Sequence, residues 1–348
     1  MDGVGRQRIF SQIHFITTEC KLQKSLIYWL FITILMFWET GSAWGVILHP
    51  EGEPNLSDWT DRPYDYAVGR WGTNCSCVAV SRNCVISVQH SGTAVVDIVF
   101  DGTAYTAEQI WNHPDADLRL AKLANANLRH FVGLYTNRNE VGQEAVIGGY
   151  GKGRGTILQT DGITYGYEWA PFGNTNLRWG TNLIEYKLDN SALGVWTSDV
   201  IIGFFDGLDI SSATAYEAMV AEYDSGGGLF IKDGSAWKVA GLFRSVKRFG
   251  ESWFRDKDFP TTPMPDDFDA VRVSSYHQWL SDRIPEVLQG DLNGDDFVDF
   301  TDFAVFARYY LNTGCQQPDW CLGADCEPDG DVDLDDLAFL LDEWLNGP

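Results

Sequence analysis

The chain contains 348 residues, of which 45% are hydrophobic and 14% aromatic, and 35 are glycine. It is too long for one small domain and suits a domain of roughly two hundred residues or more together with a smaller one. The formal net charge of −24 argues against a nucleic-acid partner, because phosphate binding needs a basic surface.

The first 45 residues have the pattern of a secretory signal peptide. Basic residues precede an apolar run from Ser25 to Trp38, and three small residues follow at positions 41–43. The run is short for a membrane span, which needs about twenty apolar residues, although an uncleaved anchor stays the alternative. We predict that residues 1–45 form a signal peptide, that the protein is secreted or at the cell surface, and that no stable membrane span is left after signal removal.

Residues 46–288 have the pattern of a mainly β domain. Apolar runs rich in Val, Ile, Leu and Phe recur between Gly, Asn and Asp residues, which is typical of short buried strands in a sandwich or barrel. One helix is predicted over Ser274–Leu288, where apolar residues recur near helical spacing. The runs that predict strands are Cys77–Val80, Val85–Val88, Ala94–Phe100, Leu118–Leu123, Ala145–Ile147, Val200–Phe205, Gly228–Ile231 and Trp237–Phe243.

The cysteines leave their pairing open. Export would permit disulfides, but each of two clusters holds three cysteines, which leaves an odd thiol in each. No pair has the two-residue gap of a zinc knuckle, so a zinc site is the less favoured interpretation. The clusters are Cys75, Cys77 and Cys84, then Cys315, Cys321 and Cys326.

Three segments contain the residue types of a nucleophilic hydrolase. His90 ends an apolar strand, Asp117 stands at the start of an alternating strand, and Ser225 lies in a Gly-rich loop before another strand. A Ser hydroxyl is a poor nucleophile at neutral pH, so an adjacent imidazole must accept its proton and a third group must hold that imidazole. Each segment alone is weak evidence, but the order His, Asp, Ser fits a catalytic triad. Asp115 is the alternative to Asp117.

These segments resemble the chymotrypsin–trypsin family of serine proteases, which has an Ala-Ala-His segment, an Asp-Ile-x-Leu-x-Lys-Leu segment and a Gly-Asp-Ser-Gly-Gly-Pro segment. The resemblance covers roughly Val68 to Leu280 and implies two six-stranded antiparallel β-barrels with the active site between them. It also implies that His90 is the general base, that Asp117 orients it, and that Ser225 attacks the scissile carbonyl. The backbone N–H groups of Tyr223 and Ser225 would then form the oxyanion hole.

The chain departs from that family at several positions. Val88 and Gln89 stand where the family has two alanines. No Cys follows His90, although Cys75 stands near where its disulfide partner would be. Tyr223 replaces a glycine and is less free to adopt unusual backbone angles, which puts the oxyanion hole in question.

Activation and specificity are left open by the resemblance. No Ile-Val-Gly-Gly sequence is present, so the family's salt bridge from a new N-terminus to the residue at Asp224 is not established by the sequence. Met219 lies six residues before Ser225, where the family often has the floor of its primary pocket. An apolar floor would favour a hydrophobic substrate side chain.

The C-terminal segment, residues 291–348, is strongly acidic, with 15 Asp and Glu residues and one Arg. It contains two acidic loops 34 residues apart, each followed by a helix-like segment, Phe303–Leu311 and Leu337–Leu345. Both loops fill the ligand positions of an EF-hand, and their carboxylates repel one another until a cation neutralises them. A solvated acidic linker is the alternative. Two calcium ions are therefore the predicted cofactors, with the ligands Asp291, Asn293, Asp295, Phe297, Asp299, Asp302, Asp325, Glu327, Asp329, Asp331, Asp333 and Asp336.

Asp instead of Glu at the last loop position, and two half-hands in tandem, resemble the dockerin type I module. That family binds two calcium ions and docks onto cohesin domains. The resemblance implies a small α-helical, EF-hand-like domain over residues 289–348 with a cohesin-like partner. We expect calcium to fold this domain. Its helices should share an apolar seam of Phe303, Val305, Phe306, Leu337, Phe339 and Leu340.

The combined prediction is a secreted serine endopeptidase. Its protease domain would cover residues 46–288 and its calcium-dependent docking domain residues 289–348, with a peptide or protein as substrate. The competing hypothesis is a catalytically silent protease homologue that acts as a calcium-dependent binding or scaffold protein. The change at Tyr223 favours the second hypothesis, and the intact His, Asp and Ser favour the first.

Overall fold

The structure is a computed structural model in which the first 45 residues lie outside the described part, so the predicted signal peptide is not tested. No helix in the described part of the chain combines the length and apolar character needed to cross a bilayer. The described residues are 46–49, 59, 61–92, 96–128, 130–171, 176–234, 236–285, 288, 290–295, 297–315, 320–326 and 329–345.

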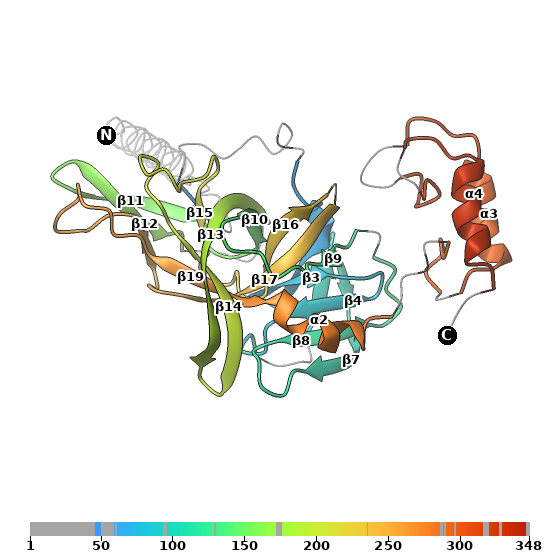
Figure 1. The fold of residues 1–348 in the computed structure, drawn as a ribbon, viewed down its shortest axis with the longest axis horizontal. Coiled ribbons are helices and arrows are strands. Elements are labelled where there is room, and N and C mark those ends of the chain that lie inside the picture. Colours follow the sequence, from blue (N-terminus) through green and yellow to red (C-terminus); the bar gives the residue numbers. More distant parts are fainter. Residues whose placement is uncertain are drawn as a thin grey trace, which may run out of the picture. The chain divides into compact units, whose positions relative to one another are not determined.

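The N-terminal half of the β-rich region is a seven-stranded antiparallel sheet (Figure 1). It differs from the expected six-stranded barrel because β6 adds a short edge strand whose exposed residues form no apolar run. The four runs predicted as strands in this half each overlap an observed and largely buried strand, although the start of the run Ala94–Phe100 lies outside the described residues. The strands β2, β6 and β7 were not predicted. The order is β6 (Thr103–Tyr105), β5 (Ile98–Phe100), β2 (Val68–Trp71), β3 (Cys75–Ala79), β4 (Cys84–Ser87), β8 (Arg119–Leu123), β7 (Ala107–Asn112).

The C-terminal half contains a closed ring of six antiparallel strands, in agreement with the barrel expected there. The ring closes because β16 pairs with both β10 and β17. The short strand β9 (Gly133–Leu134) adds to β17 in parallel. In order, the ring consists of β16 (Gly228–Asp233), β10 (Glu144–Gly149), β13 (Arg178–Leu193), β14 (Trp196–Phe204), β19 (Asp267–Arg272) and β17 (Ala236–Val246).

Smaller elements complete this region. The helix α2 (Val273–Ser281) is shorter than the predicted Ser274–Leu288. It ends early because Pro285 disfavours the helical conformation of the residue before it. The 3-10 helix η1 covers Asp65–Ala67. The remaining strands form a three-stranded sheet of β11 (Arg154–Thr160), β12 (Ile163–Trp169) and β18 (Glu251–Trp253), and a pair of β1 (Ile47–Leu48) with β15 (Ala218–Met219).

One hydrophobic core joins the two sheets. Val78 and Ile86 of the first sheet belong to the same buried cluster as Phe230, Val239 and Leu242 of the second. All five side chains are fully buried. Burial of this apolar area fixes the strand ends that carry His90 and Ser225 against each other.

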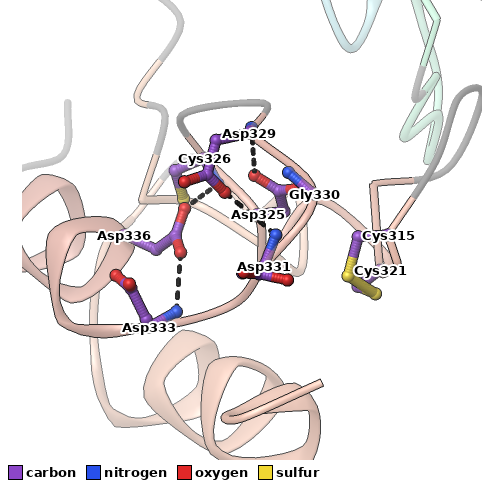
Figure 2. Close-up of a disulfide and its surroundings, with 9 residues drawn as sticks. All are labelled: Cys315, Cys321, Asp325, Cys326, Asp329, Gly330, Asp331, Asp333 and Asp336. Atoms are coloured by element: carbon purple, nitrogen blue, oxygen red, sulfur yellow. Dashed lines mark hydrogen bonds between the residues drawn. A yellow bond between two sulfur atoms is a disulfide. The ribbon is translucent and has the colours of Figure 1, made fainter. Parts of the chain in front are cut away.

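The acidic C-terminal segment contains α3 (Phe300–Tyr309) and α4 (Leu334–Asp342). Each helix begins three residues before the predicted start because Asp299 and Asp333 cap them through their carboxylates. Phe306, Val305, Leu340 and Leu337 belong to the core of this segment as predicted, whereas Phe303 and Phe339 are exposed. A disulfide joins Cys315 to Cys321 (Figure 2). The free cysteines in the described residues are Cys75, Cys77, Cys84 and Cys326.

Candidate active site

The three predicted triad residues lie in one hydrogen-bonded line. His90 Nε2 is 2.9 Å from the Ser225 hydroxyl oxygen, and His90 Nδ1 is 2.6 Å from Asp117 Oδ2. The imidazole is partly open to solvent, with 25% of its side chain exposed, whereas the Asp117 side chain is fully buried. This geometry lets the imidazole accept the Ser225 proton while Asp117 holds the required tautomer.

Asp117 is held by hydrogen bonds from the segment that follows β4 and from β14. Its Oδ1 accepts the N–H groups of Gln89 and His90 at 2.7 and 2.9 Å. Its own N–H donates to the Ser198 hydroxyl at 2.9 Å, and Ser198 is fully buried on β14. The alternative residue, Asp115, is exposed and makes no contact of this kind. The structure therefore brings Asp117, and not Asp115, to His90.

Gln89 replaces an expected alanine and has a structural role. Its side-chain amide donates to the carbonyl oxygens of His113 and Ala116, both at 2.7 Å. These bonds join the segment that carries His90 to the turn that carries Asp117. The departure at this position therefore supports the triad geometry.

The loop around Ser225 needs its glycines. Gly226 has a φ of 80°, which favours glycine, and a Cβ there would overlap the Ser87 hydroxyl. A Cβ on Gly227 would lie 2.7 Å from the carbonyl oxygen of Gly148. The Ser225 carbonyl accepts the N–H of Ser76 at 2.8 Å. The loop is thus fastened to the first sheet while the Ser225 hydroxyl stays on the side of His90.

Tyr223 adopts the left-handed conformation that the sequence made doubtful, with a φ of 76°. Its carbonyl accepts the Ser76 hydroxyl at 3.3 Å, which holds the peptide group in place. Within the described residues, the N–H groups of Tyr223 and Ser225 donate to no protein acceptor. Two such donors beside a nucleophile are available for a developing oxyanion.

Asp224, in the loop around Ser225, is fully buried and contacts Val46, which directly precedes β1. Its carboxylate accepts the N–H groups of Gly151 at 2.6 Å, Ala221 at 2.9 Å and Val46 at 3.4 Å. Burial raises the pKa of Asp224 to about 7, although these backbone bonds oppose the shift. Val46 is itself fully buried and has a φ of 50°, which is rare for a β-branched residue. No local pattern predicted the contact between Val46 and Asp224, because the family's activation sequence is missing.

A cleft of about 670 Å³ opens at His90 and Ser225. Met219, the expected pocket floor, does not line it and is buried in the barrel core, where it pairs with Ile47. The expectation at this position was wrong because β15 (Ala218–Met219) directs the chain into the core before it reaches the cleft. The lining residues are Asn74, Cys75, His90, Ser91, Gly92, Leu193, Gly194, Trp196, Val220, Ala221, Glu222, Tyr223, Ser225, Phe243, Arg244, Ser245, Val246 and Phe249.

Cys75 stands beside the residue that follows His90. Burial raises the pKa of the Cys75 thiol to about 12, and the neighbouring Ser91 side chain opposes this shift. The Cys75 thiol and the Ser91 hydroxyl therefore occupy the two positions at which the chymotrypsin–trypsin family has a disulfide.

The first acidic loop gathers three predicted ligands. Oxygen atoms of Asp291, Asp295 and Asp302 lie within 4.8 Å of one another, and among the described residues this is the one cluster with the geometry to hold a metal ion. Asn293 lies beside them, with its amide 3.0 Å from Asp295. The Asp299 carboxylate instead caps α3. The Phe297 N–H donates to Asp295 Oδ1 at 3.0 Å.

Figure 2 shows the second loop, whose backbone bonds are similar to those of the first. Asp336 accepts the N–H groups of Cys326 and Asp333 at 2.6 and 2.8 Å, as Asp302 accepts those of Asn293 and Asp299. Asp325 accepts those of Asp329 and Gly330 at 3.3 and 3.0 Å, and Asp329 accepts that of Asp331. Asp333 caps α4. Glu327 lies outside the described residues.

No family model matches the chain, and no curated protein matches it. Its structure is similar to that of neuropsin, a serine protease expressed in the limbic system of mouse brain, with a TM-score of 0.42 and 17% sequence identity. The match covers 63% of this chain and 94% of that one. A likeness of this size carries no functional conclusion, so the function has to be judged from the chain's own residues.

Proposed function

We propose that the chain is a secreted serine endopeptidase of the chymotrypsin–trypsin type. The observation that carries the proposal is the line of hydrogen bonds from Asp117 through His90 to Ser225. Beside it lie the N–H groups of Tyr223 and Ser225, which donate to no acceptor among the described residues. Positioned base, nucleophile and oxyanion donors are together the requirements of acyl transfer.

In the proposed reaction His90 accepts the proton of the Ser225 hydroxyl as its oxygen attacks the scissile carbonyl carbon. The N–H groups of Tyr223 and Ser225 stabilise the negative oxygen of the tetrahedral intermediate. His90 then gives its proton to the leaving amine, which departs and leaves an acyl-enzyme on Ser225. Water, deprotonated by His90, hydrolyses the acyl-enzyme and restores the hydroxyl. Asp117 stabilises the imidazolium in both halves of the reaction.

Activation would use the buried carboxylate of Asp224. A chain that begins at Val46, as the predicted signal boundary implies, would carry its α-ammonium group where the Val46 N–H now contacts Asp224. A buried carboxylate is stabilised far more by a cation than by a neutral donor. Removal of the first 45 residues would thus fix the loop that contains Tyr223 and Ser225.

The acidic C-terminal segment is proposed to bind two calcium ions in a dockerin-like module. Asp291, Asp295 and Asp302 converge as oxygen ligands for a hard cation, and the second loop has the same backbone pattern around Asp325 and Asp336. Bound calcium would neutralise these carboxylates. A cohesin-like partner is proposed from the sequence resemblance alone.

The test of the peptidase proposal is hydrolysis of a fluorogenic peptide and ester library by the chain that begins at Val46. Ser225→Ala and His90→Ala should each remove nearly all turnover, because the triad acts as a unit. Asp117→Asn should cost several orders of magnitude, while Asp115→Asn serves as the matched control and should keep wild-type turnover. Undiminished turnover in the Ser225→Ala variant would favour the silent homologue.

A further inference from the structure

The hairpin of β13 and β14 contains the longest strand of the barrel. β13 has 16 residues and β14 has 9, and they run as one long ribbon to a turn at Gly194 and Val195 (Figure 1). Close to this turn, Leu193 and Trp196 line the cleft that contains His90 and Ser225. The hairpin therefore supplies a wall of the candidate active site from outside the sequence segments of the triad.

The hairpin is fastened near its turn to the segment that carries Asp117. Thr197 N–H donates to the Asp115 carbonyl at 2.8 Å, and the buried Ser198 hydroxyl accepts the N–H of Asp117 at 2.9 Å. These bonds fix the position of Trp196 relative to the triad. A side chain held in this way contributes a defined surface to a binding site.

A buried arginine holds the opposite strand of the hairpin. Arg244 on β17 donates to the carbonyl and the hydroxyl of Ser191 at 3.0 and 2.8 Å. The same guanidinium forms a bidentate ion pair with Asp269, at 2.8 and 2.6 Å. Only 2% of the Arg244 side chain is exposed. Its charge is therefore compensated within the protein and does not give the cleft a preference for an acidic substrate group.

Two further lining residues, Val246 and Phe249, are apolar. Val246 and Phe249 follow Arg244 along the chain and line the same cleft, and 75% of Phe249 is exposed. At the rim, Glu222 is paired with Lys152 at 2.6 Å. An exposed apolar surface beside a nucleophile favours a ligand that can bury it.

We propose that Leu193, Trp196, Val246 and Phe249 form a subsite for a large apolar side chain close to the scissile bond. The inference rests on the proposed peptidase function and names its substrate class: peptides with a bulky aliphatic or aromatic residue at that position. Trp196 is the principal specificity-determining residue, because it has the largest apolar surface of the four and is anchored through Ser198 to Asp117.

The experiment compares peptide substrates that differ only by Phe or Ala at one position, for each position flanking the scissile bond. For the wild type, kcat/KM should favour Phe at one position. Trp196→Ala should reduce that Phe-to-Ala ratio by about tenfold, the discrimination that a lost apolar contact of this size gives. Val195→Ala is the matched control: Val195 is in the same turn, is 87% exposed and does not line the cleft. Its ratio should equal that of the wild type.

The outcomes separate this inference from the proposed function. A wild type that hydrolyses none of the peptides contradicts the proposed function itself. A wild type that hydrolyses them with the same Phe-to-Ala ratio as Trp196→Ala contradicts only the subsite. A ratio that falls equally in Val195→Ala and Trp196→Ala would point to a general loss of hairpin structure and would also overturn the assignment to Trp196.

Discussion

The backbone nitrogen of Val46 lies 3.4 Å from Oδ2 of Asp224, the residue directly before the candidate nucleophile. Both residues are fully buried. In a chain extended beyond Val46 this nitrogen is a neutral amide, whereas in a chain that begins there it is an ammonium group. The two forms of the protein therefore differ by one buried charge next to the loop that contains Tyr223 and Ser225.

The first prediction concerns this difference. The chain that begins at Val46 should have a kcat/KM about a hundredfold above that of a chain extended by residues 43–45. The reason is that replacing a neutral N–H beside a buried carboxylate by an ammonium group is worth about 3 kcal/mol, and each 1.4 kcal/mol is a factor of ten in rate. Steady-state kinetics of the two purified forms is the measurement. Asp224→Asn, which cannot form the ion pair, should abolish the difference between them. Equal rates for the two unsubstituted forms would contradict this activation route.

The second prediction is the pH dependence of stability. In the extended chain, burial raises the pKa of Asp224 to about 7. Because the folded chain then holds a proton that the unfolded chain loses, the free energy of unfolding should fall as pH rises from about 4 to about 7. In the chain that begins at Val46 the ammonium group lowers the pKa of Asp224, so this fall should disappear. The ion pair instead raises the pKa of the α-amino group above its usual value of about 8, and its contribution should be lost as pH rises through that raised value.

Urea unfolding of both forms at a series of pH values, in the Ser225→Ala background to prevent self-cleavage, is the measurement. If the free energy of unfolding has the same pH dependence in both forms, the ionisation of Asp224 does not depend on whether the chain begins at Val46.

The third prediction concerns Tyr223. Its φ of 76° costs about 1 kcal/mol or more in a residue other than glycine. Tyr223→Gly should therefore keep or raise the turnover number, because glycine reaches this conformation without strain and its N–H remains an oxyanion donor. Tyr223→Phe is the control for the hydroxyl group. A large loss of turnover in the glycine variant alone would assign a separate role to the aromatic ring.

Several parts of this site could be predicted from the sequence because they depend on local patterns. The triad residues each end or begin a strand whose apolar run is visible, and the loop at Ser225 needs glycines wherever it folds. Runs of this kind detect only buried strands, so the half-exposed β13 (Arg178–Leu193) was not predicted. The predicted helices of the acidic segment started late because their first turns are polar and begin at capping Asp residues.

The contacts between distant segments could not be predicted. Ser198 reaches Asp117 across 81 positions and Val46 reaches Asp224 across 178, and no local pattern marks either pair. Such pairs are set by how the sheets pack, which a single sequence does not show. Met219 illustrates the same point, since its distance from Ser225 along the chain suggested a pocket floor and packing placed it in the core.

The fourth prediction concerns calcium. Calorimetric titration of the full chain should show two bound ions, and Asp291→Ala and Asp325→Ala should each remove one, since each substitution deletes a buried carboxylate from one loop. Peptide hydrolysis should persist in both variants. Asp342→Ala, outside both loops, is the control for general charge loss. If calcium gives no heat of binding with the unsubstituted chain, the calcium prediction is wrong and the segment is an acidic linker.

If Ser225 is an activated nucleophile, an organophosphonate should label it covalently. Intact-mass and peptide analysis of the chain that begins at Val46 should find one adduct, on Ser225. Ser225→Ala should give no adduct, and His90→Ala should form one only at a greatly reduced rate. Absence of labelling in the folded wild-type protein, or an adduct on another residue with Ser225 unmodified, would contradict the account.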